Sequence, residues 1–268
     1  MITDRLLTLR RAVNGLSQGH SSTVFDPISL GARTVDEALG GGLVRGGLHE
    51  VYAATTAHTG AATGFAVALA FKASRERPIL WVRQDYLDTE IGRLNASGLA
   101  ELGFNPSRVI LVRAKDAEGV LRAGEQAARC PALGTVLIEP WGTPKILDLT
   151  ASRRLSLASA KSGVPTVMLR VAASPSQSAA ATRWMVEALP SHPLAANAPG
   201  FPVFQLTLLR QRGGVAGRSW PLEWDRDRKC FQERQQPASA PVSRAVVSVS
   251  PDRPATAGAR IQEFRRTG

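Results

Sequence analysis

Short apolar runs alternate with longer helical patterns along the chain from about residue 29 onward. The apolar runs have the length of buried strands, and the segments between them repeat apolar residues at three- and four-residue spacing. The predicted strands are 48–54, 79–83, 109–112, 135–139, 166–171 and 203–210. The predicted helices are 62–73, 87–102, 117–129, 146–162 and 176–189. This alternation predicts an α/β fold, with a mostly parallel twisted sheet and helices on both of its faces.

The C-terminal part of this body breaks the alternation. Gly213 and Gly214 stand between two apolar runs, which is typical of a hairpin turn. Residues 219–224 are the expected return strand of the hairpin. The sheet should therefore end in an antiparallel C-terminal hairpin.

The two ends of the chain differ from the body, so we divide the chain into 1–28, 29–234 and 235–268. Residues 2–13 place apolar and basic side chains at helical spacing, which predicts an amphipathic helix followed by a polar linker. The last segment is rich in Pro, Ser, Ala, Val and Arg and carries a net charge of +3, which predicts a disordered basic tail. Its Arg260, Arg265 and Arg266 surround two apolar residues, which indicates either a short partner-binding motif or, as we favour, a solvated tail.

Composition excludes several classes of protein. The chain has 268 residues, of which 44% are hydrophobic, so most of it should bury a core. Two cysteines outside any CxxC motif exclude a disulfide scaffold and a zinc ribbon, and four scattered histidines form no metal-ligand spacing. No apolar run is long enough to span a bilayer, and the N-terminus lacks the apolar stretch of a secretory signal. We therefore expect a cytoplasmic protein without membrane contact.

The charge balance is strongly basic, with a net charge of +11 and 28 Arg against 5 Lys. One interpretation is affinity for a phosphate backbone or an acidic partner. The other is that Arg-rich and Lys-poor usage reflects a GC-rich genome. The basic residues are spread along the chain, which favours a general positive field over a dedicated basic arm.

The segment after the first predicted strand lies where a phosphate-binding loop would sit in this topology. Such a loop needs the pattern GxxxxGK[ST], in which the Lys contacts the β and γ phosphates and the Ser or Thr holds magnesium. The chain has no Gly-Lys pair, and Ala53 and Ala54 stand where a Gly and a small residue are expected. Thr59, Gly60 and Thr63 remain. We expect a vestigial site without a cofactor, either a packed turn or a residual anion site at the helix N-terminus.

Two carboxylates follow neighbouring strands at the same predicted edge. Glu139 ends an apolar run, as does the acidic residue that holds magnesium through water in nucleotide hydrolases, and Asp85 follows the second strand. The pair could serve as a catalytic base and a metal-side acid. It could equally join Arg113, Lys115 and Arg170 in a structural ion network, which we favour because the loop Lys is missing.

Several segments carry a resemblance to a known family. SLGARTVDEALGGGLVRGGLHEVYAA resembles the opening of the RecA core. Together with ATGFAVALA, ILWVRQDYLDTEIGRL and TVLIEPWG, it resembles the ImuA family, the small RecA-like, SulA-related proteins of bacterial mutagenesis cassettes. The resemblance covers roughly residues 29–234 and implies a RecA-like fold. In that alignment Glu139 matches the Walker B strand end, and the turn at Gln84 and Asp85 lies near RecA's catalytic glutamate.

The resemblance also implies a function in the SOS response to DNA damage, as a DNA-repair protein of error-prone translesion synthesis. The implied partners are the Y-family-like protein ImuB and an error-prone C-family DNA polymerase. The positive charge of the chain adds the expectation of non-specific DNA contact and a location at the nucleoid. Residues 173–182 occupy the place of RecA's second DNA-binding loop and are short and uncharged, which argues against a RecA-style filament. An oligomer formed through the N-terminal helix remains an alternative to packing of that helix on its own domain.

Three functional hypotheses follow. The first is a non-catalytic accessory protein. Its candidate DNA- or partner-facing residues are Arg153, Arg154, Arg210, Arg212, Arg218 and the three tail arginines. The alternative for each of these arginines is that it is an ordinary solvated surface residue. The second is a RecA-type DNA-dependent ATPase that remodels filaments or loads the polymerase. The third is a SulA-like inhibitor of cell division. The missing Gly-Lys pair favours the first hypothesis, in which the protein is not an enzyme.

Overall fold

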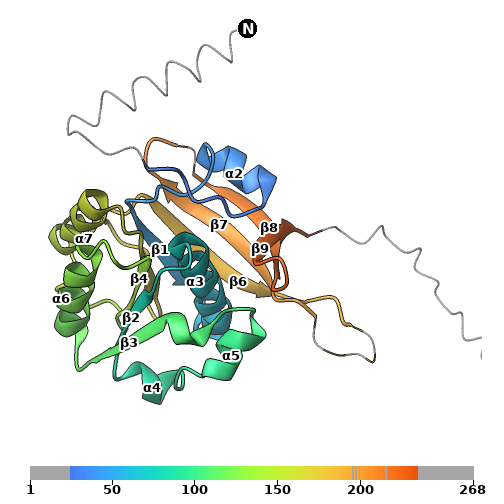
Figure 1. The fold of residues 1–268 in the computed structure, drawn as a ribbon, viewed down its shortest axis with the longest axis horizontal. Helices are drawn as coiled ribbons and strands as arrows, with labels where there is room; N and C mark the ends of the chain where they lie inside the picture. The colour runs from blue at the N-terminus through green and yellow to red at the C-terminus, as the bar shows by residue number, and fades with distance from the viewer. Residues whose placement is uncertain (1–24, 195, 197, 199, 215, 235–268) are drawn as a thin grey trace, which may run out of the picture. The chain divides into compact units, whose positions relative to one another are not determined.

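The structure is a computed structural model that describes residues 25–194, 196, 198, 200–214 and 216–234. Within these residues, helices lie on both faces of a nine-stranded sheet (Figure 1). The helices are α2 (Arg33–Leu39), α3 (Thr59–Ser74), α4 (Leu87–Glu90), α5 (Ala96–Glu101), α6 (Ala117–Ala128) and α7 (Leu149–Ser162), with 3₁₀ turns η1 (Thr56–His58) and η2 (Pro106–Arg108). The strands are β1 (Leu48–Ala53), β2 (Ile79–Gln84), β3 (Val109–Ala114), β4 (Thr135–Glu139), β5 (Thr166–Arg170), β6 (Thr182–Leu189), β7 (Val203–Gln211), β8 (Arg218–Asp225) and β9 (Cys230–Glu233). The predicted helix at 2–13 and the predicted tail at 235–268 lie outside the described residues.

The strand order is β3-β2-β4-β5-β1-β6-β7-β8-β9. All pairs from β3 to β6 are parallel, and the pairs from β6 to β9 are antiparallel. The predicted α/β class, the mostly parallel sheet and the antiparallel C-terminal strands are thus confirmed. Because β1, β2, β4 and β5 run in one direction, their carboxyl ends meet at one edge of the sheet.

Helix α3 forms the core of one face. Its sequence is apolar or small on nearly every side, which is typical of a helix buried all round. The ring centroid of Phe65 lies 5.8 Å from that of Trp184 on β6 and 5.3 Å from that of Phe231 on β9. Residues far apart in sequence therefore meet on this helix, and Phe65→Ala should cost about 3–5 kcal/mol of stability.

Helices α6 and α7 cover the opposite face. The strands alternate between the two cores, so Leu137 packs on the α3 side while its neighbours Val136 and Ile138 pack with α6 and α7. A Cβ added to Gly124 of α6 would lie 2.5 Å from a methyl carbon of Ile138, so only glycine lets the helix approach this closely. None of the helices in the described residues is long and apolar enough to cross a membrane.

The predicted helix at 176–189 is wrong. Residues 173–181 contain no regular element, and 182–189 form β6 between β1 and β7. Trp184 and Val186 alternate into the α3 core with a period of two, and strand pairing on both sides overrides the helical propensity of this segment. The α6 and α7 face therefore has no helix between β5 and β6.

The single predicted helix at 87–102 is also wrong, because the segment forms two short helices, α4 and α5. Gly92 breaks the helix with a φ of +84°, in the left-handed region that favours glycine. Asn95 then caps α5 by accepting a hydrogen bond from the Ser97 backbone N–H at 3.0 Å. Sequence reasoning also missed α2 and β9, which are short elements without a long periodic pattern.

Candidate functional site

The turn between β1 and α3 occupies the place of the phosphate loop. Ala53 is buried at the end of β1, and the Ala54 backbone N–H donates to the Val186 carbonyl oxygen at 3.1 Å. The other end is tied to the same strand, because the Ala188 backbone N–H donates to His58 Nδ1 at 3.0 Å. The 3₁₀ turn η1 lies between these two anchors, so the segment is a short turn held against β6.

The remaining residues of the predicted vestigial site begin α3. Thr59 is buried, and its hydroxyl oxygen has no hydrogen-bond partner among the described residues. Gly60 is exposed with open space around it, and Thr63 is half-buried. No lysine lies in the segment from Ala53 to Thr63, so this helix end offers backbone N–H groups and hydroxyls but no side-chain cation.

Glu139 ends β4 and is buried beside β2. Its Oε2 accepts hydrogen bonds from Trp81 Nε1 at 3.0 Å and from Arg83 Nε at 2.9 Å. Burial raises the pKa of Glu139 to about 7, and the neighbouring Arg83 and Trp81 donors oppose that rise in part. The carboxyl group at the Walker B position is thus bound to protein donors.

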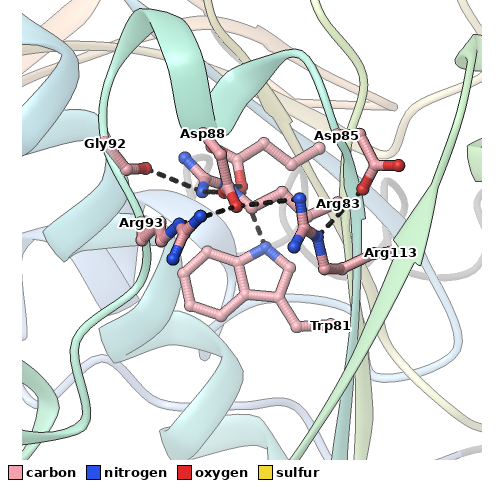
Figure 2. Close-up of polar contacts among 8 residues, drawn as sticks. Trp81, Arg83, Asp85, Asp88, Gly92, Arg93 and Arg113 are labelled. Carbon is pink, nitrogen blue, oxygen red and sulfur yellow. Dashed lines mark hydrogen bonds and ion pairs between the residues drawn. The ribbon is translucent and has the colours of Figure 1, made fainter.

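Arg83 extends this contact into an ion network at the carboxyl edge (Figure 2). The guanidinium is buried, pairs with Asp88 and donates to the Gly92 carbonyl oxygen at 2.8 Å. Arg113 Nη2 lies 3.0 Å from Asp88, and Arg113 Nε lies 2.9 Å from Asp85. The two predicted carboxylates therefore belong to one chain of alternating charges and do not face each other.

This network has different members from those that the sequence indicated. Arg113 takes part, but Arg83 is the partner of Glu139, whereas Arg170 donates to Tyr52 Oη at 3.1 Å. The structure gives no ion pair for Lys115 among the residues it describes. Across the described residues, the carboxylate, imidazole and thiol side chains form no cluster of three or more that could hold a metal ion.

A second buried polar cluster lies on β1, β5 and β6, and sequence reasoning missed most of it. Glu50 Oε2 accepts hydrogen bonds from Arg183 Nε and from Ser178 Oγ, both at 2.9 Å. The Arg170 and Arg183 guanidiniums lie 5.3 and 6.0 Å from the Tyr52 ring centroid, and burial raises the pKa of Tyr52. The only sequence signal was polar residues inside the apolar run 48–54.

Three of the predicted basic residues come together around a pocket of about 300 Å³. The lining residues are Leu149, Arg153, Ser156, Leu157, Ser178, Ala179, Arg210 and Arg212. Arg154 and Arg218 are exposed and do not line this pocket. Arg260, Arg265 and Arg266 lie outside the described residues.

The mostly parallel sheet, with α3 following β1 and antiparallel C-terminal strands, is a RecA-like fold. The crystal structure of the RadB recombinase matches with a TM-score of 0.52 at 16% identity, covering 78% of this chain and 100% of that chain, which shows the fold alone. No family model matches the chain.

The chain belongs to the ImuA family. Protein ImuA of Caulobacter vibrioides, in strains NA1000 and CB 15, is 34% identical in an alignment of 212 residues that covers 73% of this chain and 82% of the relative. The resemblance inferred from the sequence motifs is thereby confirmed. Membership of this family and the RecA-like fold support an accessory role in a mutagenesis cassette.

Proposed function

We propose that this chain is a non-catalytic RecA-like accessory protein of damage-induced, error-prone translesion synthesis. It binds ImuB and assists the assembly of the mutagenic C-family polymerase on DNA. The observation that carries the non-catalytic part is the hydrogen bonding of Glu139 to Arg83 and Trp81. In a nucleotide hydrolase, the acidic residue at this strand end must hold magnesium through water.

The residues present do not fit a triphosphate with magnesium. The Arg83 guanidinium is within hydrogen-bonding distance of Glu139 Oε2, so a cation at that oxygen would meet a positive charge. At the turn after β1, no lysine is available to neutralise the β and γ phosphates. These two features lie at the same edge of the sheet, and both weaken a nucleotide site for electrostatic reasons.

A thermal melt of the full chain with ATP and magnesium separates this proposal from the ATPase alternative. We expect the melting temperature to stay within about 1 °C of the nucleotide-free value, because a ligand stabilises a fold only to the extent that it binds. The matched variant is Glu139→Gln, melted with and without ATP. A clear upward shift in the wild-type chain that disappears in this variant would show nucleotide binding through Glu139 and favour the ATPase alternative.

The partner part of the proposal is tested by co-purification with ImuB and with the C-family polymerase. We expect the full chain to retain ImuB, and a chain lacking 235–268 to retain it more weakly while keeping a cooperative melt. No retention of ImuB by the full chain contradicts the proposed function. Loss of the cooperative melt on truncation would show that the folded body extends past residue 234.

The DNA part rests on the net charge of +11. If the chain contacts DNA through the phosphate backbone, the logarithm of the affinity should fall linearly with the logarithm of the salt concentration. Fluorescence anisotropy with a labelled duplex, measured from about 50 to 200 mM salt, gives this slope. A flat response, or no binding at low salt, removes direct DNA contact from the proposal.

A further inference from the structure

The pocket beside α7 exists because a helix is missing. On this face of the sheet α6 packs against α7, but the chain from β5 to β6 runs through the irregular segment 173–181. Among the described residues, the side of α7 toward β6 and β7 therefore has no helical neighbour. The loop residues Ser178 and Ala179 and the end of β7 form the opposite wall of the resulting pocket.

The α7 wall of the pocket presents leucine, arginine and leucine on three successive turns. Leu149, Arg153 and Leu157 are spaced four residues apart, so they share one face of the helix. The two leucines are 44% and 63% exposed. Their stripe is about 12 Å long at 1.5 Å per residue, which a ligand of about four extended residues would match.

The opposite wall is basic and held in place. Arg210 donates to the Ser178 carbonyl oxygen, and Arg212 Nη2 donates to the Ala179 carbonyl oxygen at 2.7 Å. Ser178 is buried and donates in turn to Glu50. Each arginine uses only part of its five N–H donors in these contacts, so donors remain for an anion.

The arginines of this pocket have no carboxylate partner in the part of the chain that the structure describes. Within the described part of the chain, no carboxylate pairs with Arg153, Arg210 or Arg212. The nearby Glu50 pairs with Arg183 at 2.9 Å. The pocket thus combines three positive charges with two exposed apolar side chains, a combination that an acidic ligand with an apolar group would complement.

We propose that this pocket, which we call the α7 pocket, docks a short acidic segment with bulky apolar side chains from a partner protein. This proposal rests on the proposed function, since an accessory protein acts by binding a partner. The chain's own ends are poorly suited, because residues 1–24 carry one Asp against three Arg and residues 235–268 have a net charge of +3. A second copy is disfavoured by the net charge of +11 on each chain.

A nucleic acid is the competing ligand, and the lining argues against it. Sites for single strands combine a basic track with aromatic rings on which bases stack. None of the eight lining residues is aromatic, and leucines flank the central arginine on α7. Carboxylates beside apolar side chains match this surface better than a phosphate backbone does.

The test measures the binding of a fluorescein-labelled peptide of about twelve residues, made of Asp, Glu and two Leu, to the full chain at low salt. We expect Arg153→Glu and Leu157→Ser each to weaken binding at least about tenfold. The matched control is Arg154→Glu, which makes the same charge change at the next residue of α7 outside the pocket and should change affinity less than about twofold. Arg153 and Arg154 are both exposed, so the melting temperatures of their Glu variants should match that of the wild type.

Three outcomes would overturn the α7 pocket proposal. The peptide does not bind the wild-type chain, or Arg153→Glu and Arg154→Glu weaken it equally, which indicates only a diffuse field. Alternatively, a single-stranded oligonucleotide of about 20 nucleotides depends on Arg153 and Leu157 while the peptide does not. A peptide with Gly in place of Leu should bind more weakly, and equal binding contradicts the apolar part of the proposal.

Binding of ImuB separates the two proposals. If ImuB binds the double variant Arg153→Glu and Leu157→Ser as tightly as the wild-type chain, the α7 pocket is not its docking site and the proposed function still holds. If ImuB does not bind the wild-type chain, the proposed function fails. The peptide measurement alone then shows whether the α7 pocket binds an acidic segment. If ImuB binding falls at least about tenfold in the double variant, both proposals are supported.

Discussion

The contact between Arg83 and Glu139 allows a quantitative prediction about what this edge of the sheet does. Their side chains are only 4% and 1% exposed, and Arg83 Nε lies 2.9 Å from Glu139 Oε2. The perturbation is a double-mutant cycle in which each residue is replaced by Met, singly and together. Methionine fills a similar volume without charge, so the cycle removes the interaction while limiting the cavity left behind.

The magnitude follows from what each single change leaves unpaired. Glu139→Met leaves the buried Arg83 with Asp88 and Gly92, and leaves the Trp81 indole N–H without an acceptor. Breaking a buried ion pair from one side costs about 3–5 kcal/mol, and we expect the lower end because Asp88 remains. The double variant should cost less than the sum of the single variants, with a coupling energy of about 2 kcal/mol.

The assay is urea unfolding of the full chain without nucleotide, followed by tryptophan fluorescence. The control cycle uses Glu118 and Arg122, an exposed pair on α6 with side chains 58% and 74% exposed, which should couple by no more than about 0.5 kcal/mol. A coupling energy for Arg83 and Glu139 as small as that of the control pair would refute the reasoning. Glu139 would then not stabilise the fold through Arg83, and a role for its carboxylate in nucleotide binding would again be open.

Two further predictions concern pH and backbone geometry. Burial lowers the pKa of His49 to about 4. Between about pH 6.5 and pH 4, the unfolded chain therefore binds a proton at this histidine that the folded chain does not bind. The free energy of unfolding should fall by up to about 3 kcal/mol as the pH falls through this window. Glu139, with its pKa raised to about 7, has the opposite effect between about pH 4.5 and pH 7, so Glu139→Gln should steepen the loss of stability on acidification. In urea unfolding at several pH values, equal slopes for Glu139→Gln and the wild type would contradict the Glu139 assignment. Gly103 has a φ of +83°, and an added Cβ would lie 2.3 Å from the Arg226 carbonyl oxygen, so Gly103→Ala should lower stability by at least about 2 kcal/mol. Gly98→Ala on α5 meets open space and should be neutral or stabilising in the same unfolding measurement, and a similar result for both glycines would show that the close approach at Gly103 does not matter.

The sequence by itself determined the fold class and the loss of the phosphate loop. Four apolar runs matched β1, β2, β4 and β5, because an inner strand of a parallel sheet is covered on both faces. The apolar run at 109–112 matched β3, which lies at the edge of the sheet and is partly exposed. The missing Gly-Lys pair is a property of the sequence itself. The family motifs are also local, since each is one continuous stretch of the chain.

Elements that depend on their neighbours were beyond the sequence. Residues 182–189 form β6 because β1 and β7 offer hydrogen-bonding edges on both sides, which a local pattern does not contain. The partner of Glu139 was missed for the same reason, because β2 lies next to β4 only in the folded sheet, where Arg83 is in register with Glu139.

The α7 pocket shows the same division. Arginines at 153, 210 and 212 were visible as scattered charges, yet their gathering required the antiparallel return of β7 along β6 and the lack of a helix at 173–181. Local hydrophobic periodicity specifies which segments are buried, because burial depends on each side chain's own chemistry. Which charges meet is decided by the tertiary structure, because electrostatic contacts act between residues that only the strand order brings within a few ångströms.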